Sequence, residues 1–86
     1  MQTYLVELYL PRPPRGDAAA SGARARAAAV ELAREGVRIG YLRTTFLPDD
    51  ETCFHLVAAG ACEDVRRLCR RAGFEQARIA QAEETS

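Results

Sequence analysis

The sequence predicts a single α+β domain over residues 1–86, with four β-strands and two α-helices in the order β-α-β-β-α-β. Three observations lead to this prediction. Four short segments have the apolar or alternating pattern of strands, and two other segments carry apolar residues at helical spacing. A glycine, Gly36 or Gly73, follows each helical segment at the place where a left-handed residue commonly ends a helix.

The first strand is predicted over residues 3–10 and the first helix over residues 17–35. The proline-rich run 11–16 stops the strand, because proline cannot donate to a sheet ladder. High alanine content favours the helix, and either Asp17 or Ser21 is its predicted N-cap. The two sides of the strand carry Tyr4, Val6, Leu8 and Leu10 against Leu5, Glu7 and Tyr9, and the helix residues predicted to face the sheet are Ala25, Ala28, Ala29 and Leu32.

The second strand is predicted over residues 37–47 and is followed, after an acidic turn at 48–51, by the third, so the two form a hairpin. The second helix is predicted over 61–72 and the last strand over 78–82, with a frayed tail at 83–86. Alternation in the second strand places Val37, Ile39 and Tyr41 on one side and Leu42, Thr44 and Phe46 on the other.

This order of elements is that of the ferredoxin-like fold, a four-stranded antiparallel sheet with both helices on one face. The first and third strands become central neighbours. The second face of the sheet is left to solvent or to a partner.

The third strand carries the most informative residues of the chain. Alternation separates Cys53, His55 and Val57 from Phe54, Leu56 and Ala58. The second set is the more apolar one and is predicted to face the core. We therefore expect the only histidine, His55, and the thiol of Cys53 on the open face of the sheet.

Composition excludes several classes of function. Twelve acidic residues balance twelve basic ones, which argues against a nucleic-acid-binding surface. No apolar run approaches the roughly 20 residues of a membrane-spanning helix, and the N-terminus lacks the pattern of a secretion signal. Three cysteines without a CxxC pair indicate free thiols in a reducing cytoplasm.

Several segments together resemble a family of small bacterial ferredoxin-like proteins of mostly unknown function, some of which are described as nickel-binding. The segments are 4–7, 41–46, 50–54, 65–66 and 71–74, with the alanine-rich helix and Arg78-Ile79. The resemblance implies a ferredoxin-like dimer and a divalent metal such as nickel. Family members often have histidine at the position of Arg43, or near Leu68, so a histidine-rich site does not carry over to this chain residue by residue.

The residues themselves suggest three sites on the open face. A carboxylate beside an imidazole suits acid–base chemistry, so Glu7 and His55 are a candidate catalytic pair, or simply hydrogen-bond partners in a dimer interface. Thiolate and imidazole ligands suit nickel, zinc or copper, so Cys53, His55 and Glu7 are candidate metal ligands. The third site is for a carboxylate-bearing ligand held by Arg43, with Tyr41 and Thr45 at the alternate positions of the same strand; Tyr9 is a further ligand-binding candidate.

Two functions follow as expectations. The first is a small cytoplasmic homodimer that binds a divalent metal or a small ligand on its open sheet face. The second is a small dimeric α+β barrel enzyme, an isomerase, cyclase or cofactor-free monooxygenase, that uses His55 and Glu7. In both, the sheet faces pair, because Leu5, Tyr9 and Val57 together form too large an apolar patch to leave in water.

Overall fold

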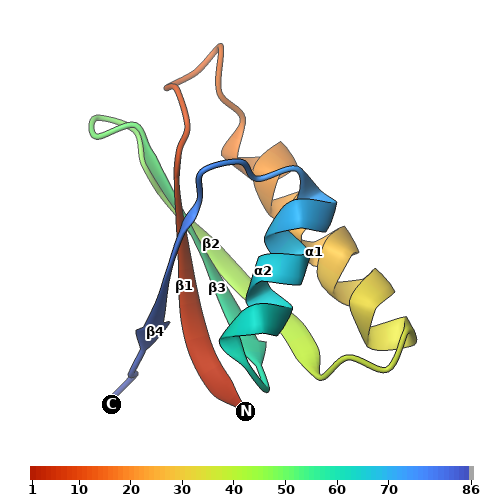
Figure 1. Ribbon diagram of the computed structural model, residues 1–86. Helices are drawn as coiled ribbons and strands as arrows, with labels where there is room; N and C mark the ends of the chain where they lie inside the picture. Colours follow the sequence, from red (N-terminus) through yellow and green to blue (C-terminus); the bar gives the residue numbers. More distant parts are fainter. Residues whose placement is uncertain (86) are drawn as a thin grey trace.

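The computed structural model describes residues 1–85 and confirms the predicted fold class. Its elements are β1 (Gln2–Tyr9), α1 (Ala18–Arg34), β2 (Ile39–Leu47), β3 (Thr52–Ala59), α2 (Cys62–Ala72) and β4 (Arg78–Ala82). The strands form one antiparallel sheet in the order β2-β3-β1-β4, so β1 and β3 are the central neighbours, as predicted. Figure 1 shows that both helices lie on one side of this sheet.

Helix α1 begins where its sequence supplies a cap. The side chain of Asp17 accepts a hydrogen bond from the backbone N–H of Ala20, which satisfies one of the free donors of the first turn. Of the two N-caps considered from the sequence, Asp17 is therefore the correct one. The helix ends at Arg34, and Gly36 follows with a φ of 94°, a conformation that glycine adopts without steric cost.

Helix α2 is shorter and ends in the same way, at Gly73 with a φ of 78°. Its first turn carries Glu63 and Asp64 and its last turn carries Arg70 and Arg71. Negative charges at the N-terminus and positive charges at the C-terminus interact favourably with the helix dipole and stabilise the helix. No helix in residues 1–85 has the length and apolar character needed to cross a membrane.

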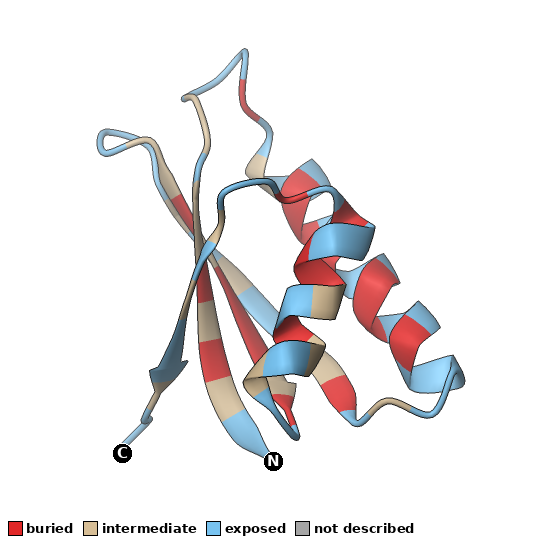
Figure 2. Cartoon of the chain, viewed as in Figure 1, coloured by how far each residue is buried: buried red, intermediate tan, exposed pale blue. Residues whose placement is uncertain are grey.

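The core lies between the helices and the sheet. Figure 2 shows buried and partly exposed residues alternating along β1, as expected for a strand covered on one face. Small residues on α1 let that helix approach the sheet closely, and larger side chains from β1, β3 and α2 fill the space between. The buried residues include Val6, Ala25, Ala28, Ala29, Leu32, Val57, Val65 and Leu68.

A bulge in β2 changes which of its side chains share a face. The pairing with β3 shifts between Tyr41 and Arg43, because Leu42 is an extra residue on the β2 side. Tyr41 pairs with Val57 and Thr44 pairs with His55, so Tyr41 and Thr44 both lie on the helix side of the sheet. The prediction that these two lie on opposite sides was therefore wrong.

The predicted orientation of β3 was also wrong. Cys53, His55 and Val57 are all fully buried and lie under the helices, whereas Phe54 and Leu56 lie on the open face. The register shows the reason, because His55 stands opposite Val6, whose side chain is in the core. Strand alternation sorted the residues into the correct two sets, but the covered set is the one with polar atoms, and α1 provides partners for them.

Candidate functional site

A hydrogen-bonded polar network surrounds His55 inside the core. Ser21 on α1 places its Oγ 2.8 Å from Nε2 of the imidazole, and Thr44 on β2 places its Oγ1 2.7 Å from Nδ1. Thr44 Oγ1 also lies 2.5 Å from the hydroxyl of Tyr41. A neutral imidazole has one N–H and one bare nitrogen, so one neighbouring hydroxyl accepts from the ring and the other donates to it. The network therefore satisfies both ring nitrogens.

The surroundings of His55 favour the neutral ring. The pKa of His55 is lowered from 6.5 to about 4, chiefly by burial and to a smaller extent by the positive charge of Arg24. Phe74 stacks on the imidazole with ring centroids 5.0 Å apart. The guanidinium of Arg24 lies over the Phe74 ring, 5.7 Å from its centroid. The histidine is thus a neutral, fully bonded member of the core near neutral pH.

Cys53 shares this buried environment. Its Sγ lies 3.8 Å from Nε2 of His55, and burial raises the pKa of the thiol above its usual value. The structure therefore brings together two of the three predicted metal ligands, Cys53 and His55. Glu7, the third, lies on the opposite face of the sheet. Within residues 1–85 no group of three or more His, Cys, Asp and Glu side chains could hold a metal ion.

Glu7 pairs with a different residue. Its Oε1 lies 3.4 Å from Nη1 of Arg78 on the neighbouring strand β4, and it stands opposite Phe54 on β3. Because strand neighbours point to opposite faces, Glu7 and the buried His55 face away from each other. The prediction that they share a face, and with it the predicted acid–base pair, is not realised in this chain.

The three predicted ligand-binding residues are also divided. Arg43 and Tyr9 lie on the open face, and Tyr9 is 65% exposed. Tyr41 lies under α1, where the guanidinium of Arg26 stacks 5.1 Å from its ring centroid. Tyr9 and Glu7 line the same cavity, of about 240 Å³, at the end of the sheet beside the β2–β3 turn.

Ser21 and Thr44 are the members of the buried network that the sequence did not suggest as site residues. A signal for Ser21 was present, because it precedes Ala25, Ala28 and Leu32 on the same helical stripe. A hydroxyl on a buried stripe needs a hydrogen-bond partner in the sheet it faces. Thr44 had no such signal, because its face depends on the bulge.

Gly22 on α1 packs directly against the hydroxyl groups of Thr44 and Tyr41. A Cβ at this position would lie 2.8 Å from Thr44 Oγ1 and 3.1 Å from the hydroxyl of Tyr41. Only a residue without a side chain therefore lets α1 approach β2 so closely.

We expect Gly22→Ala to destabilise the protein by about 1–2 kcal/mol, although alanine is the better helix former by about 1 kcal/mol. Urea unfolding followed by circular dichroism measures the change. In a Thr44→Ala background the closest overlap is removed, so the same substitution should cost less there. A Gly22→Ala protein more stable than the wild type would contradict the close approach.

On the open face of the sheet, the central strands β3 and β1 carry apolar side chains and Glu7, and the edge strands β2 and β4 carry arginines. Across the four strands, in the order β2, β3, β1 and β4, one row is Arg43, Leu56, Leu5 and Ala80, and the next is Thr45, Phe54, Glu7 and Arg78. We call these eight residues the open-face grid. Leu5, Phe54 and Leu56 form its centre, and no helix of residues 1–85 covers them. Val57, which was predicted to be part of this patch, is in the core instead.

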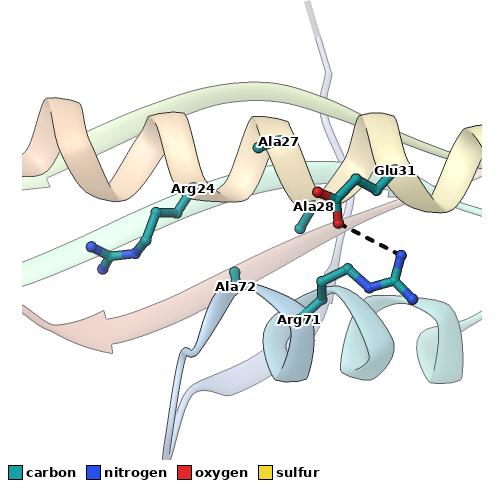
Figure 3. Close-up of a pocket in the computed structure, with 6 residues that line it drawn as sticks. All are labelled: Arg24, Ala27, Ala28, Glu31, Arg71 and Ala72. Atoms are coloured by element: carbon teal, nitrogen blue, oxygen red, sulfur yellow. Dashed lines mark ion pairs between the residues drawn. The ribbon is translucent and has the colours of Figure 1, made fainter.

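The helical side has a small cavity of its own, of about 160 Å³, between α1 and α2 (Figure 3). Ala27, Ala28 and Ala72 contribute small side chains to its lining. Arg71 lies 3.7 Å from Glu31 and also pairs with Glu35, so carboxylates of α1 already balance its charge. None of the site residues predicted from the sequence lines this cavity.

Comparison with protein-family models, with curated protein sequences and with solved structures gives no match for this chain.

Proposed function

We propose that the protein is a small homodimeric binding protein whose open sheet faces pair and hold a small organic ligand between them. The open-face grid carries this proposal. Its centre contains Leu5, Phe54 and Leu56, and no helix of residues 1–85 covers these apolar side chains. A chain of 86 residues has a small core, and pairing with a second copy adds apolar burial that it lacks alone.

The charges of the face suit a second copy of the same chain. Glu7 and Arg78 form an ion pair at one side of the apolar centre, and Arg43 pairs with Glu84 from the C-terminal segment at the other. Two acidic and two basic groups leave the face without net charge. Two identical faces can therefore meet without the like-charge repulsion that opposes association of strongly charged surfaces.

The geometry favours an organic ligand over the other expectations. A metal at Cys53 and His55 would have two protein ligands, both in the core, and Glu7 is not available as the third. The buried His55 is also separated from Glu7 as an acid–base partner. Arg43, Arg78 and Tyr9, by contrast, lie on the open face, where their donors can reach a bound molecule.

Phe54→Glu is expected to abolish the dimer. The substitution places a charge at the apolar centre of the proposed interface, where it would lose its water without gaining a partner. In sedimentation experiments at micromolar concentration, the wild type should have twice the 9.5 kDa mass of one chain and the variant should have the mass of one chain.

Val30→Glu provides the matched control. Val30 is 42% exposed on α1, on the helical side of the sheet, so the same added charge should leave the dimer intact. Circular dichroism checks that both variants are folded. A wild type that remains monomeric up to 100-fold higher concentration would defeat the proposal.

A further inference from the structure

A side chain of the C-terminal segment contacts a side chain of the far edge strand. Arg43 is on β2, at one edge of the sheet, whereas Glu84 follows β4, which forms the opposite edge. Nevertheless Nη2 of Arg43 lies 3.2 Å from Oε2 of Glu84. In Figure 1 the chain after β4 runs on to the C-terminus away from both helices. The tail was predicted to be frayed; its last residue, Ser86, lies outside the described residues, but Glu84 makes a defined contact.

The surroundings of this ion pair are apolar. Arg43 stands in the same row of the open-face grid as Leu56 and Leu5. Leu56 is only 9% exposed although no helix covers this face, so neighbouring side chains shield it. Leu5 and Phe54 are partly exposed on the same face, so a molecule with a carboxylate on Arg43 can place an apolar body against these two side chains.

From this contact we infer that Arg43 is the anchor of a site for amphipathic carboxylates, and that Glu84 occupies the anchor when no ligand is bound. The ligand carboxylate replaces that of Glu84 on the guanidinium, and the apolar part of the ligand lies along Leu5 and Phe54. The inference rests on the proposed function, since it names the ligand class of the same face.

Exchange at Arg43 should be easy. The side chains of Arg43 and Glu84 are 60% and 49% exposed, and exposed ion pairs contribute little to stability. Arg78 is a poorer anchor, because its partner Glu7 is on the adjacent strand and is not removed when the tail moves. Guanidinium donors suit a carboxylate geometrically, which makes arginine well suited to this role.

The test uses octanoate as the probe and the arginine Nε–Hε NMR signal of Arg43 as the readout. We expect octanoate to shift this signal in the wild type. Glu84→Gln should bind octanoate about twofold to fivefold more tightly, because the competing carboxylate is gone. Arg43→Gln should weaken binding at least about tenfold, because the charged donor is lost. Arg38→Gln, which alters an exposed arginine outside the grid, should bind like the wild type.

Three results would overturn the inference. The Arg43 signal could be the same in the wild type and in Glu84→Gln without octanoate, which would show that the tail does not occupy the arginine. Octanoate could leave the signal unchanged even in Glu84→Gln. Octanol could bind as well as octanoate, which would show that the carboxylate is not recognised.

Sedimentation of the same samples separates this inference from the proposed dimer. A monomer that binds octanoate through Arg43 would refute the dimer alone. A dimer whose Arg43 signal does not respond would refute the carboxylate site alone.

Discussion

Replacing His55 by alanine is expected to lower the free energy of unfolding by about 3–5 kcal/mol, a large part of the stability of so small a domain. The substitution removes a fully buried ring that stacks on Phe74 and leaves a cavity in its place. It also removes a hydrogen-bond partner from Ser21 and from Thr44; Thr44 keeps the hydroxyl of Tyr41, whereas the buried hydroxyl of Ser21 loses the imidazole. A buried hydroxyl without a partner costs about 1–3 kcal/mol.

Equilibrium unfolding in urea, at pH 7.5 where the ring is neutral, measures this effect. Ser21→Ala is the graded control, because it removes one hydrogen bond and little volume; we expect it to cost about 1 kcal/mol. Val30→Ala, at an exposed position on α1 outside the open-face grid, should change the stability by less than about 0.5 kcal/mol. A His55→Ala protein within 1 kcal/mol of the wild type would show that the network contributes little to the fold.

Acidification is expected to destabilise the protein by about 3 kcal/mol between pH 6.5 and pH 4. The folded protein holds His55 with a pKa of about 4, against 6.5 for an unperturbed histidine, mainly because burial disfavours the charged ring. In this interval the unfolded chain binds a proton that the folded chain does not. The stabilisation is therefore complete above pH 6.5, falls as the pH decreases, and is lost below about pH 4.

His55→Gln isolates this contribution, since glutamine can hydrogen-bond to the hydroxyls but does not titrate. The stability difference between the wild type and this variant should decrease steadily from pH 6.5 to pH 4. Glu35, whose pKa is lowered chiefly by its hydrogen bond with Arg71, also loses its stabilising charge in acid, but only below its ordinary value of 4.5. Parallel curves for the two proteins would contradict the predicted pKa of His55.

The strand and helix order could be predicted because it depends on local signals. Asp17 and Gly36 bound α1, Gly73 ends α2, and alternation identifies the strands from their own residues. The topology then followed from general rules on the handedness and length of connections. Each of these signals depends only on residues close together in the chain, so it can be read from the sequence without knowledge of the fold.

The faces of the candidate site residues were predicted correctly only in part. Glu7, Tyr9 and Arg43 do lie on the open face as expected, since the strands that hold them are apolar enough on the other side to fill the core. Tyr41 was assigned to the wrong face because one extra residue, Leu42, reverses the alternation of β2. The leucine side chain gives no sign that Leu42 is in a bulge and not in a regular strand.

Local sequence thus determined the elements, their order and the division of β3 into two sets of side chains. Only the tertiary structure decided which set is buried. His55 and Cys53 carry polar atoms, and the greater apolar character of Phe54 and Leu56 favoured these two as core residues. Ser21 and Thr44, which are 34 and 11 residues away from His55 in the chain, supply the hydrogen bonds that allow an imidazole to leave water. Burial of a polar group depends on partners that folding brings together, and those partners cannot be read from the strand that carries it.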